Sequence, residues 1–211
     1  METNEITFSK MEQNEWKKCG NLSARAFQDY VYLTNYFSDE TRRRTFLEYA
    51  TSLEIKLNYD NAGLFTAKSG GNILAMAILY PPKVKRVPVM TYLRAGMLKG
   101  IIKSGIKDSV AWIDMDSKAS MPCHSREGRS WYLSTLAVEP KVQRQGIGSR
   151  FMSECIIPYV SEKNGDEICL VTNSEENTKF YEKLGFELFD YREFKYRGNT
   201  TVSWSYRMPL S

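Results

Sequence analysis

The sequence is poor in the residues that build metal sites and disulfide frameworks. Its only histidine is His124, which excludes a His-rich metal site. The cysteines form no C-x-x-C pair, and their spacings do not indicate a disulfide framework. Each lies in or beside an apolar segment, so we expect buried thiols and no bound metal ion. They are Cys19, Cys123, Cys155 and Cys169.

Cys123 stands directly before His124, an order that suggests a thiol nucleophile with its base. Neighbouring residues rarely point at each other, however, and no third group that would orient the histidine is evident. We therefore expect a structural thiol here, as at Cys155 and Cys169.

Long apolar runs are also missing. The longest, Ile73 to Tyr80, is far too short to span a bilayer. The first five residues, Met1 to Glu5, are polar and acidic, unlike a secretory signal. These features predict a cytoplasmic protein with no membrane partner.

Charge of one sign is not concentrated anywhere. The net charge is +4, and the only basic cluster, Arg42 to Arg44, is expected on the solvated face of a helix. Nucleic acid usually requires a denser basic face, so no nucleic-acid partner is predicted. A polyanionic small molecule suits this charge equally well. With 211 residues, no internal repeat and no low-complexity linker, the chain 1–211 is predicted to be one domain.

The first half of the chain has two helical patterns and a hairpin. Apolar residues recur at helical spacing from Phe46 to Leu57, in a helix that Ser38 or Asp39 is expected to cap. Two glycines within 68–71 supply the positive φ that a tight turn needs. The predicted elements are a strand over 6–11, helices over 13–27 and about 39–57, and hairpin strands over 64–67 and 73–80.

The second half alternates strands and helices after a long helical stretch. Pro158 falls late in one helix, so a kink or an early end is expected there. A strand–helix–strand unit over 131–172 makes two parallel neighbours, whereas the other connections are hairpin-like, so the sheet should be mixed and the class α/β or α+β. The predicted elements are helical stretches over 88–106 and part of 108–129, strands over 131–138, 168–172, 186–194 and 201–208, and helices over 146–162 and 175–184.

The segment Gln143-Arg144-Gln145-Gly146-Ile147-Gly148 follows a predicted strand directly and opens a helix. A diphosphate bound here would meet free backbone N–H groups and the positive end of the helix dipole. Glycine at positions 146 and 148 lets the backbone approach a ligand without a Cβ in the way. By itself, such a G-x-G is equally well explained as a tight turn with a close helix–strand contact.

This segment and its surroundings resemble the GNAT (GCN5-related) N-acetyltransferases. Gln143 to Gly148 fits the family's Q/R-x-x-G-x-G/A phosphate loop, and Leu136 to Pro140 resembles its L-x-V-x-P strand end. Farther on, Asn173, Asn177 and the segment Phe180 to Phe186 resemble its N…FYxxxGF pattern. The three motifs occur in the family's order and with its spacing.

The resemblance implies a fold, a cosubstrate and a catalytic acid. The fold is a single domain with a mixed, mostly antiparallel sheet of about seven strands flanked by helices, and its parallel central strands splay around acetyl-CoA. The acetyl-CoA-binding core would span about 131–190. Tyr181 would lie near the thioester sulfur, where its phenol can donate a proton to the leaving thiolate, although a core aromatic is the alternative. The residues expected to bind acetyl-CoA are Leu136, Ala137, Val138, Gln143, Arg144, Gln145, Gly146, Ile147, Gly148, Ser149, Asn173, Asn177 and Tyr181.

The base that takes the amine proton is less evident, because the strand 131–138 contains no carboxylate. Trp131 to Val138 resembles the W-F-L-x-T-x-x-V of the puromycin N-acetyltransferase branch, and Ala26 to Tyr30 resembles its A-F-x-D-Y. In that branch the tyrosine of the second motif is a candidate proton relay, which points to Tyr30; a tyrosine packed over the cofactor pocket fits as well. His124 is the other candidate base, or else a loop residue.

The acceptor site is expected from elements within about 20–60 and 83–125. The second of these has little likeness to puromycin N-acetyltransferase, so puromycin is not supported as the substrate. The resemblance implies direct transfer of acetyl from acetyl-CoA to a primary amine of a small molecule, with no metal and no covalent enzyme intermediate. A protein acetyltransferase and a non-catalytic acyl-CoA-binding regulatory module remain open. The final strand, over 201–208, fits either the edge of a homodimer or the closing strand of a monomer.

Overall fold

One seven-stranded sheet runs through the protein, in the order β1-β2-β3-β4-β5-β7-β6. The computed structural model describes residues 5–85 and 87–210. The β4–β5 pair is parallel and the other five adjacent pairs are antiparallel, so the predicted mixed, mostly antiparallel sheet of an α/β (α+β) fold is confirmed. The strands are β1 (Thr7–Lys10), β2 (Gly63–Ser69), β3 (Asn72–Tyr80), β4 (Ser130–Val138), β5 (Glu167–Thr172), β6 (Glu187–Tyr196) and β7 (Asn199–Pro209).

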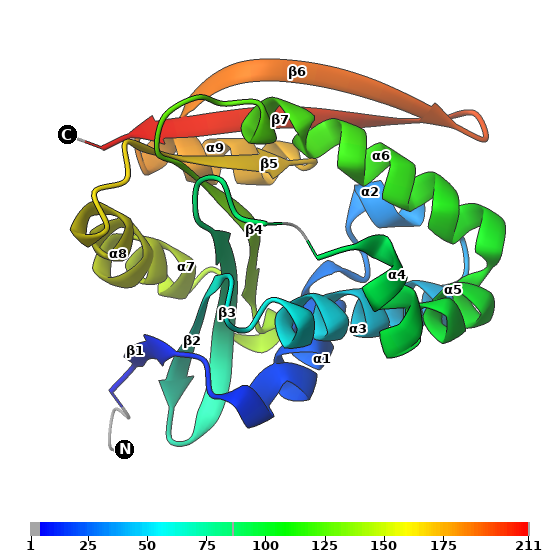
Figure 1. Cartoon of the computed structure of the whole chain (residues 1–211), viewed down its shortest axis with the longest axis horizontal. Coiled ribbons are helices and arrows are strands. Elements are labelled where there is room, and N and C mark those ends of the chain that lie inside the picture. The colour runs from blue at the N-terminus through cyan, green and yellow to red at the C-terminus, as the bar shows by residue number, and fades with distance from the viewer. Residues whose placement is uncertain (1–4, 86, 211) are drawn as a thin grey trace.

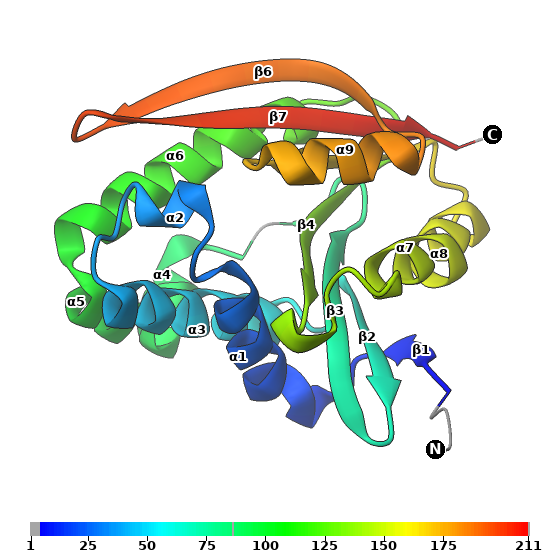
Figure 2. The same ribbon diagram turned by 180° about the vertical axis from the view of Figure 1, so that it is seen from behind.

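Helices cover both faces of this sheet (Figures 1 and 2). On one face they enclose a core around Leu33 and Phe46, and on the other a core around Phe151 and Ile156. No described helix is both long and apolar enough to cross a bilayer. The first face carries η1 (Gln13–Glu15), α1 (Trp16–Phe27), α2 (Val31–Thr34), α3 (Glu40–Leu57), α4 (Val89–Tyr92), η2 (Leu93–Met97), α5 (Leu98–Ser104) and α6 (Ile106–His124), and the second carries α7 (Ile147–Phe151), η4 (Met152–Ile156), α8 (Ile157–Glu162) and α9 (Glu175–Lys183).

The parallel strands β4 and β5 separate along their length. Their pairing begins at Ser130 and Glu167 and stops at Leu133 and Leu170, although β4 continues beside β3 as far as Val138. In Figure 1, β2, β3 and β4 run steeply, while β5, β7 and β6 cross the top of the molecule. The expected splay is therefore present, and it leaves one edge of β4 free of β5 beyond Leu133.

A β-bulge in β4 lies at the point where the two strands separate. Leu133 has a partner on β3, but the next β4 residue with a partner is Thr135, so Ser134 is the extra residue. A bulge re-aims the side chains of its strand. Here the Ser134 hydroxyl donates a hydrogen bond to Glu54 on α3, at 2.8 Å.

The start of α3 confirms one of the two expected caps and corrects the interpretation of the basic cluster. The Asp39 carboxylate accepts a hydrogen bond from the Arg42 backbone N–H at 2.8 Å. Arg43 does not lie on a solvated face, because only 9% of its surface is exposed. Its guanidinium donates to the carbonyl oxygens of Gln28 and Phe37, each at 2.8 Å. These loop carbonyls need donors, and the charged guanidinium supplies them.

Two helices differ from expectation in detail. The helix containing Pro158 does not end early, since α8 continues to Glu162. A wider turn, η4, interrupts the regular helix just before it and places the proline near the start of α8, where a missing N–H costs little. Within the expected stretch 88–106, Gly96 has φ of 118° and interrupts the helical conformation. The short helix α2 was not expected.

The last strand is not an edge of the sheet. β7 lies between β5 and β6 and pairs with both. Of the two alternatives considered for it, the edge of a homodimer is therefore wrong, because both of its hydrogen-bonding sides are already used within the chain.

Candidate active site

A cavity of about 400 Å³ lies where β4 and β5 separate. The segments Leu133–Leu136 and Val171–Asn173 line it from the two strands and the residue that follows β5. Its other walls come from α1 to α6, so both expected acceptor regions, 20–60 and 83–125, contribute. This volume is within the range of small-molecule sites.

Glu54 brings a carboxylate from α3 to the bulge of β4. Its Oε1 accepts hydrogen bonds from the Ser134 hydroxyl at 2.8 Å and from the Tyr80 hydroxyl at 3.1 Å. Within the described part of the chain, Oε2 has no hydrogen-bond partner. Burial raises the pKa of Glu54, and the two hydrogen bonds oppose that rise. A carboxylate with a raised pKa, in a cavity beside a strand bulge, is suited to accept a proton.

Asp116 brings a second carboxylate into the same cavity, from α6. The surrounding protein desolvates it and the nearby charge of Glu54 opposes its ionisation, so its pKa rises to about 7. Its side chain keeps solvent-accessible surface because it faces the open space of the cavity. At neutral pH this carboxyl group is therefore close to half ionised.

Tyr30 lies across the end of β5, as the chain leaves α1. Its hydroxyl is 3.1 Å from the Thr172 hydroxyl, and it accepts a hydrogen bond from the Asn177 side-chain amide. Burial is the main cause of its raised pKa. Tyr30 is thus protonated at neutral pH, and the structure places it together with Asn177, which was expected to contact the cofactor.

Tyr181 lies on α9 and lines the same cavity. Only 7% of its surface is exposed, and its ring packs against Phe186 with centroids 5.5 Å apart. Burial, with a smaller effect of Tyr30, raises the pKa of Tyr181. The hydroxyl therefore keeps its proton at neutral pH and is available as a donor.

The expected phosphate loop enters α7 from the end of β4. Gly146 has φ of 79°, a left-handed conformation that suits glycine. The first intrahelical bond after it runs from the Arg150 N–H to the Gly146 carbonyl at 3.0 Å, so the N–H groups of residues 147–149 precede the hydrogen-bonded ladder. A Cβ at Gly148 would meet Phe180 at 3.5 Å. The loop therefore offers free backbone donors at the start of a helix, which fits a diphosphate.

The remaining expected cofactor residues are spread along the splay. Leu136, Asn173 and Asn177 line the cavity, whereas Ala137 is buried in a core that α1 and α3 form against the sheet. Asn173 donates to the Val202 carbonyl at 2.8 Å and so ties β5 to β7. The side chains of Gln143, Arg144 and Gln145 are exposed; Gln143 donates to the Val138 carbonyl at 3.0 Å, and Arg144 pairs with Glu176 at 3.2 Å. Ser149 is half-buried, and the side chain of Ile147 is buried in the core around Phe151, so Ile147 can meet a ligand only through its backbone.

The structure does not bring His124 to this cavity. His124 lines a second cavity of about 470 Å³, near the start of β4. Its ring contacts the ring of Tyr132, with centroids 4.5 Å apart. Tyr132 lines both cavities, so it stands between His124 and the site that contains Tyr181.

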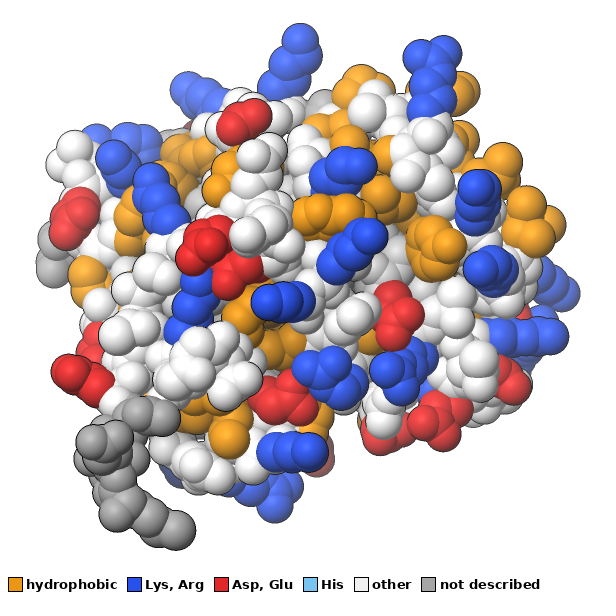
Figure 3. Space-filling model, turned by 90° about the horizontal axis from the view of Figure 1, so that it is seen from below, with side chains coloured by type: hydrophobic (Ala, Val, Ile, Leu, Met, Phe, Trp, Pro, Cys, Tyr) orange, Lys and Arg blue, Asp and Glu red, His pale blue; other side chains and the backbone are white. Residues whose placement is uncertain are grey.

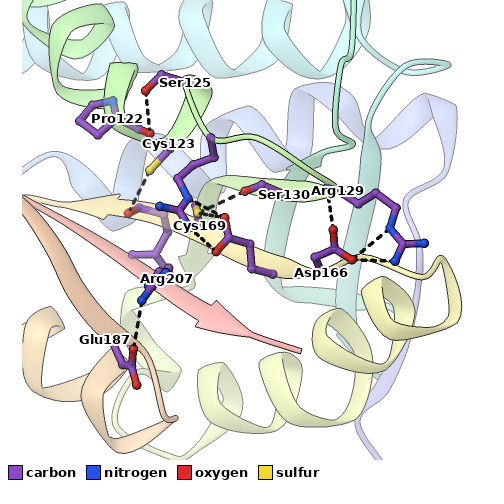
Figure 4. Close-up of polar contacts among 12 residues, drawn as sticks. Pro122, Cys123, Ser125, Arg129, Ser130, Asp166, Cys169, Glu187 and Arg207 are labelled. Atoms are coloured by element: carbon purple, nitrogen blue, oxygen red, sulfur yellow. Dashed lines mark hydrogen bonds and ion pairs between the residues drawn. The ribbon is translucent and has the colours of Figure 1, made fainter. Parts of the chain in front are cut away.

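Cys123 is a buried thiol beside β5 (Figure 4). Its sulfur lies 3.5 Å from the Leu170 carbonyl oxygen. A hydrogen bond with Cys169, together with burial, raises the pKa of Cys123. Since the thiolate is the nucleophilic form, this environment does not favour covalent chemistry at Cys123.

The charges outside the cavity are mixed. Figure 3 shows basic side chains spread over one face of the molecule, with acidic ones among them. Among the described residues, no three His, Cys, Asp or Glu side chains are grouped in a way that could hold a metal ion.

Residues 110–188 match the model of the acetyltransferase (GNAT) domain. This segment contains β4, the phosphate loop, β5 and α9, which are the elements that form the splay and its loop. No curated protein gives a significant match to the sequence.

Solved structures share the fold over nearly the whole chain, at low sequence identity. The polyamine N-acetyltransferase of Drosophila melanogaster is 14% identical, with a TM-score of 0.64 over 98% of this chain and 100% of that one. The ribosomal-protein-S18-alanine N-acetyltransferase of Escherichia coli is 16% identical, with a TM-score of 0.57 over 98% and 95%. PaiA N-acetyltransferase of Thermoplasma acidophilum, solved with coenzyme A, is 12% identical, with a TM-score of 0.58 over 98% and 99%.

The protein thus has the GNAT fold, a mixed sheet whose parallel pair opens beside helices. The domain match covers residues 110–188, and the likeness to the solved structures extends this fold over nearly the whole chain. The likeness to the puromycin N-acetyltransferase branch is not confirmed by these matches.

Two cavity carboxylates were missed by the sequence analysis. Glu54 interrupts an otherwise apolar helical face, since it follows Leu47 and Ala50 at the spacing of one side of α3. A charged residue on an apolar helical face could therefore have indicated a functional carboxylate at Glu54. Asp116 lies in a segment with weak periodicity, where the sequence offered no comparable contrast.

Proposed function

We propose that the protein is an acetyl-CoA-dependent N-acetyltransferase that acetylates a primary amine of a small molecule. One observation carries the proposal. The cavity lies where β4 and β5 separate, and both Tyr181 and Glu54 line it. Acetyl-CoA would supply the acetyl thioester, held by the loop 143–149 and the free edge of β4 beyond Leu133.

Glu54 is the proposed base and Tyr181 the proposed acid. Glu54 takes a proton from the incoming ammonium or amine, while its bonds with Ser134 and Tyr80 hold it beside the bulge. As the N–C bond forms and the C–S bond breaks, Tyr181 donates its proton to the leaving sulfur. Direct transfer needs only that both substrates are held in near-attack geometry, so no cysteine takes part.

Tyr30 is the alternative proton relay, as the likeness of residues 26–30 to the puromycin N-acetyltransferase branch suggests. Its hydroxyl forms a chain with Thr172 and Asn177 along the cavity wall. Because its pKa is raised, it can only pass a proton on and cannot hold a negative charge at neutral pH. A relay through His124 would have to cross Tyr132, and we rank it last.

A small acceptor is favoured over a protein chain because the cavity is bounded. Helices from both 20–60 and 83–125 line it, and its volume of about 400 Å³ suits a metabolite. A lysine side chain on a protein and a purely regulatory acyl-CoA site remain the competing functions.

The first experiment is to measure binding of acetyl-CoA and CoA by calorimetry, and then thiol release with a panel of small amines. Micromolar binding with amine-dependent thiol release is the expected result. Binding without release from any small amine would shift the function to a protein acceptor or a regulatory module. Absence of binding would overturn the assignment of the loop 143–149.

A further inference from the structure

The proposed acceptor cavity contains two carboxylates, and no cationic side chain among its described lining residues neutralises their charge. Glu54 and Asp116 line it from α3 and α6, and Figure 1 shows α6 above α3. No lysine, arginine or histidine is among the described residues that line it. In the part of the chain that the structure describes, neither carboxylate forms an ion pair. Glu54 is partly buried, so an unpaired charge is costly there, whereas Asp116 is exposed to the open space of the cavity and is accessible to a cation from solution.

Aromatic rings form much of the remaining wall. Tyr32 packs edge-on against Tyr30 and tilted against Trp112, with centroids 5.4 Å apart in both pairs. Tyr92 is fixed by a hydrogen bond that its hydroxyl accepts from the Asn58 amide, at 2.8 Å. Ring faces attract ammonium groups, so this wall adds to the pull of the carboxylates on a cation.

The two carboxylates have different surroundings. Glu54 is tied to Ser134, at the point where β4 leaves β5, so it lies at the end of the cavity nearest the expected thioester. Asp116 is on the opposite wall and has no hydrogen-bond partner among the described residues. Glu54 is thus placed to accept a proton from the reacting nitrogen, and Asp116 can bind a second, positively charged group.

We propose that the acceptor is an aliphatic diamine, whose near nitrogen faces Glu54 while its distal ammonium forms an ion pair with Asp116. This inference rests on the proposed acetyltransferase function. The near ammonium gives one proton to Glu54, which later releases it to solvent, and the nitrogen then forms the N–C bond. As the C–S bond breaks, the nitrogen's remaining excess proton replaces the one that Tyr181 gives to the leaving sulfur. The thiolate takes its proton from Tyr181, and the distal ammonium stays protonated and unacetylated.

The charge of Asp116 depends on a limited set of neighbours. Glu54 on α3 opposes its ionisation, and Tyr32 on α2 and Tyr132 on β4 face it with raised pKa values of their own and remain neutral. Because the pKa of Asp116 is about 7, its carboxylate becomes fully available as the pH rises from about 6 to 8. The preference for a diamine over a monoamine should rise over the same interval.

The test compares 1,4-diaminobutane, butylamine and 2-phenylethylamine in the wild-type protein and in Asp116→Asn. The diamine should have a kcat/KM at least about 10-fold above butylamine in the wild type. Asp116→Asn should lower the value for the diamine by about 10- to 100-fold, mostly through KM, and should leave butylamine within about threefold. It should also abolish the rise of the diamine preference with pH.

Asp114→Asn is the matched control, since it removes the same charge from the same helix. Asp114 does not line the cavity and pairs with Lys118 at 2.6 Å on the surface. Its kinetics should match the wild type for all three amines, which separates a local effect of Asp116 from a change in net charge.

Three results would overturn the inference: equal use of butylamine and the diamine, an equal loss with both in Asp116→Asn, or a preference for 2-phenylethylamine that Asp116→Asn leaves intact. Calorimetry of 1,4-diaminobutane with the CoA-loaded protein separates this inference from the proposed function. Binding that depends on Asp116 but gives no thiol release would remove the transferase function and keep the diamine site. Absence of both binding and release would overturn the diamine site.

Discussion

The two ligand-binding regions are built from different parts of the polypeptide. The expected acetyl-CoA region consists mainly of backbone: a strand edge freed beyond Leu133, a turn at Gly146 and the N–H groups of residues 147–149. The proposed acceptor cavity consists mainly of side chains from α1 to α6, α9 and two strands, and among the described residues that line it only Glu54 and Asp116 are acidic.

This difference bears on what substitution can change. A backbone site is insensitive to most side-chain replacements and fails only where new atoms enter its space. A side-chain site can alter its charge, size and selectivity with single replacements. The acetyl-CoA region should therefore be fixed in what it binds, and the acceptor cavity should be adjustable.

The largest effect is expected from a side chain added where the backbone should contact the pyrophosphate. Gly148→Glu should weaken CoA binding by at least about 100-fold, through bulk and through repulsion of the pyrophosphate. Gly148→Ala is the control, since its Cβ would meet Phe180 at 3.5 Å, an ordinary contact. Calorimetry with CoA measures both, and unchanged binding by Gly148→Glu would mean that the loop does not hold the pyrophosphate.

A change at Glu54 should affect chemistry without affecting the backbone site. Glu54→Gln keeps an oxygen that accepts from Ser134 and Tyr80, but it cannot take a proton, so kcat should fall about 100- to 10,000-fold while the Kd for CoA stays the same. In the wild type, activity should rise with pH through the raised pKa of Glu54, because the base works only when ionised. Persistence of that acidic limb in Glu54→Gln would assign it to another group.

Tyr181→Phe should have a smaller effect. A thiolate is a fairly stable leaving group, so loss of the proton donor should lower kcat by about 10- to 100-fold. The phenylalanine keeps the packing against Phe186, and CoA binding and the unfolding temperature should not change. Steady-state kinetics equal to the wild type would leave Tyr181 a packing residue only.

Tyr30→Phe should have the smallest effect, if Glu54 is the base. The variant loses the bonds with Thr172 and Asn177 but no proton acceptor, so kcat/KM should fall by less than about 10-fold with an unchanged pH profile. A loss as large as that of Glu54→Gln, with a changed profile, would instead make Tyr30 the relay.

Local sequence patterns predicted the fold well, including the elements that form the splay and its loop. The strand 131–138, the loop that contains Gly146 and the helix that carries Tyr181 are each encoded by residues close together in the chain. Their mutual placement follows from a single right-handed strand–helix–strand crossover.

The acceptor cavity could not be predicted in the same way, because its residues meet only in the folded protein. Glu54 and Ser134 are 80 positions apart and come together only because a one-residue bulge re-aims β4. Arg43 shows the same limit. Its charge predicted an exposed side chain, but the guanidinium is buried because it donates hydrogen bonds to loop carbonyls of other segments.

The cavity also shares part of its lining with the splay, since Leu136, Asn173, Asn177 and Tyr181 belong to both. A molecule that fills the gap between β4 and β5 would therefore complete one wall of the acceptor pocket. The two ligands should then bind cooperatively, each raising the affinity for the other by the same factor. In kinetic terms, this coupling should appear as a KM for the amine that falls as acetyl-CoA approaches saturation.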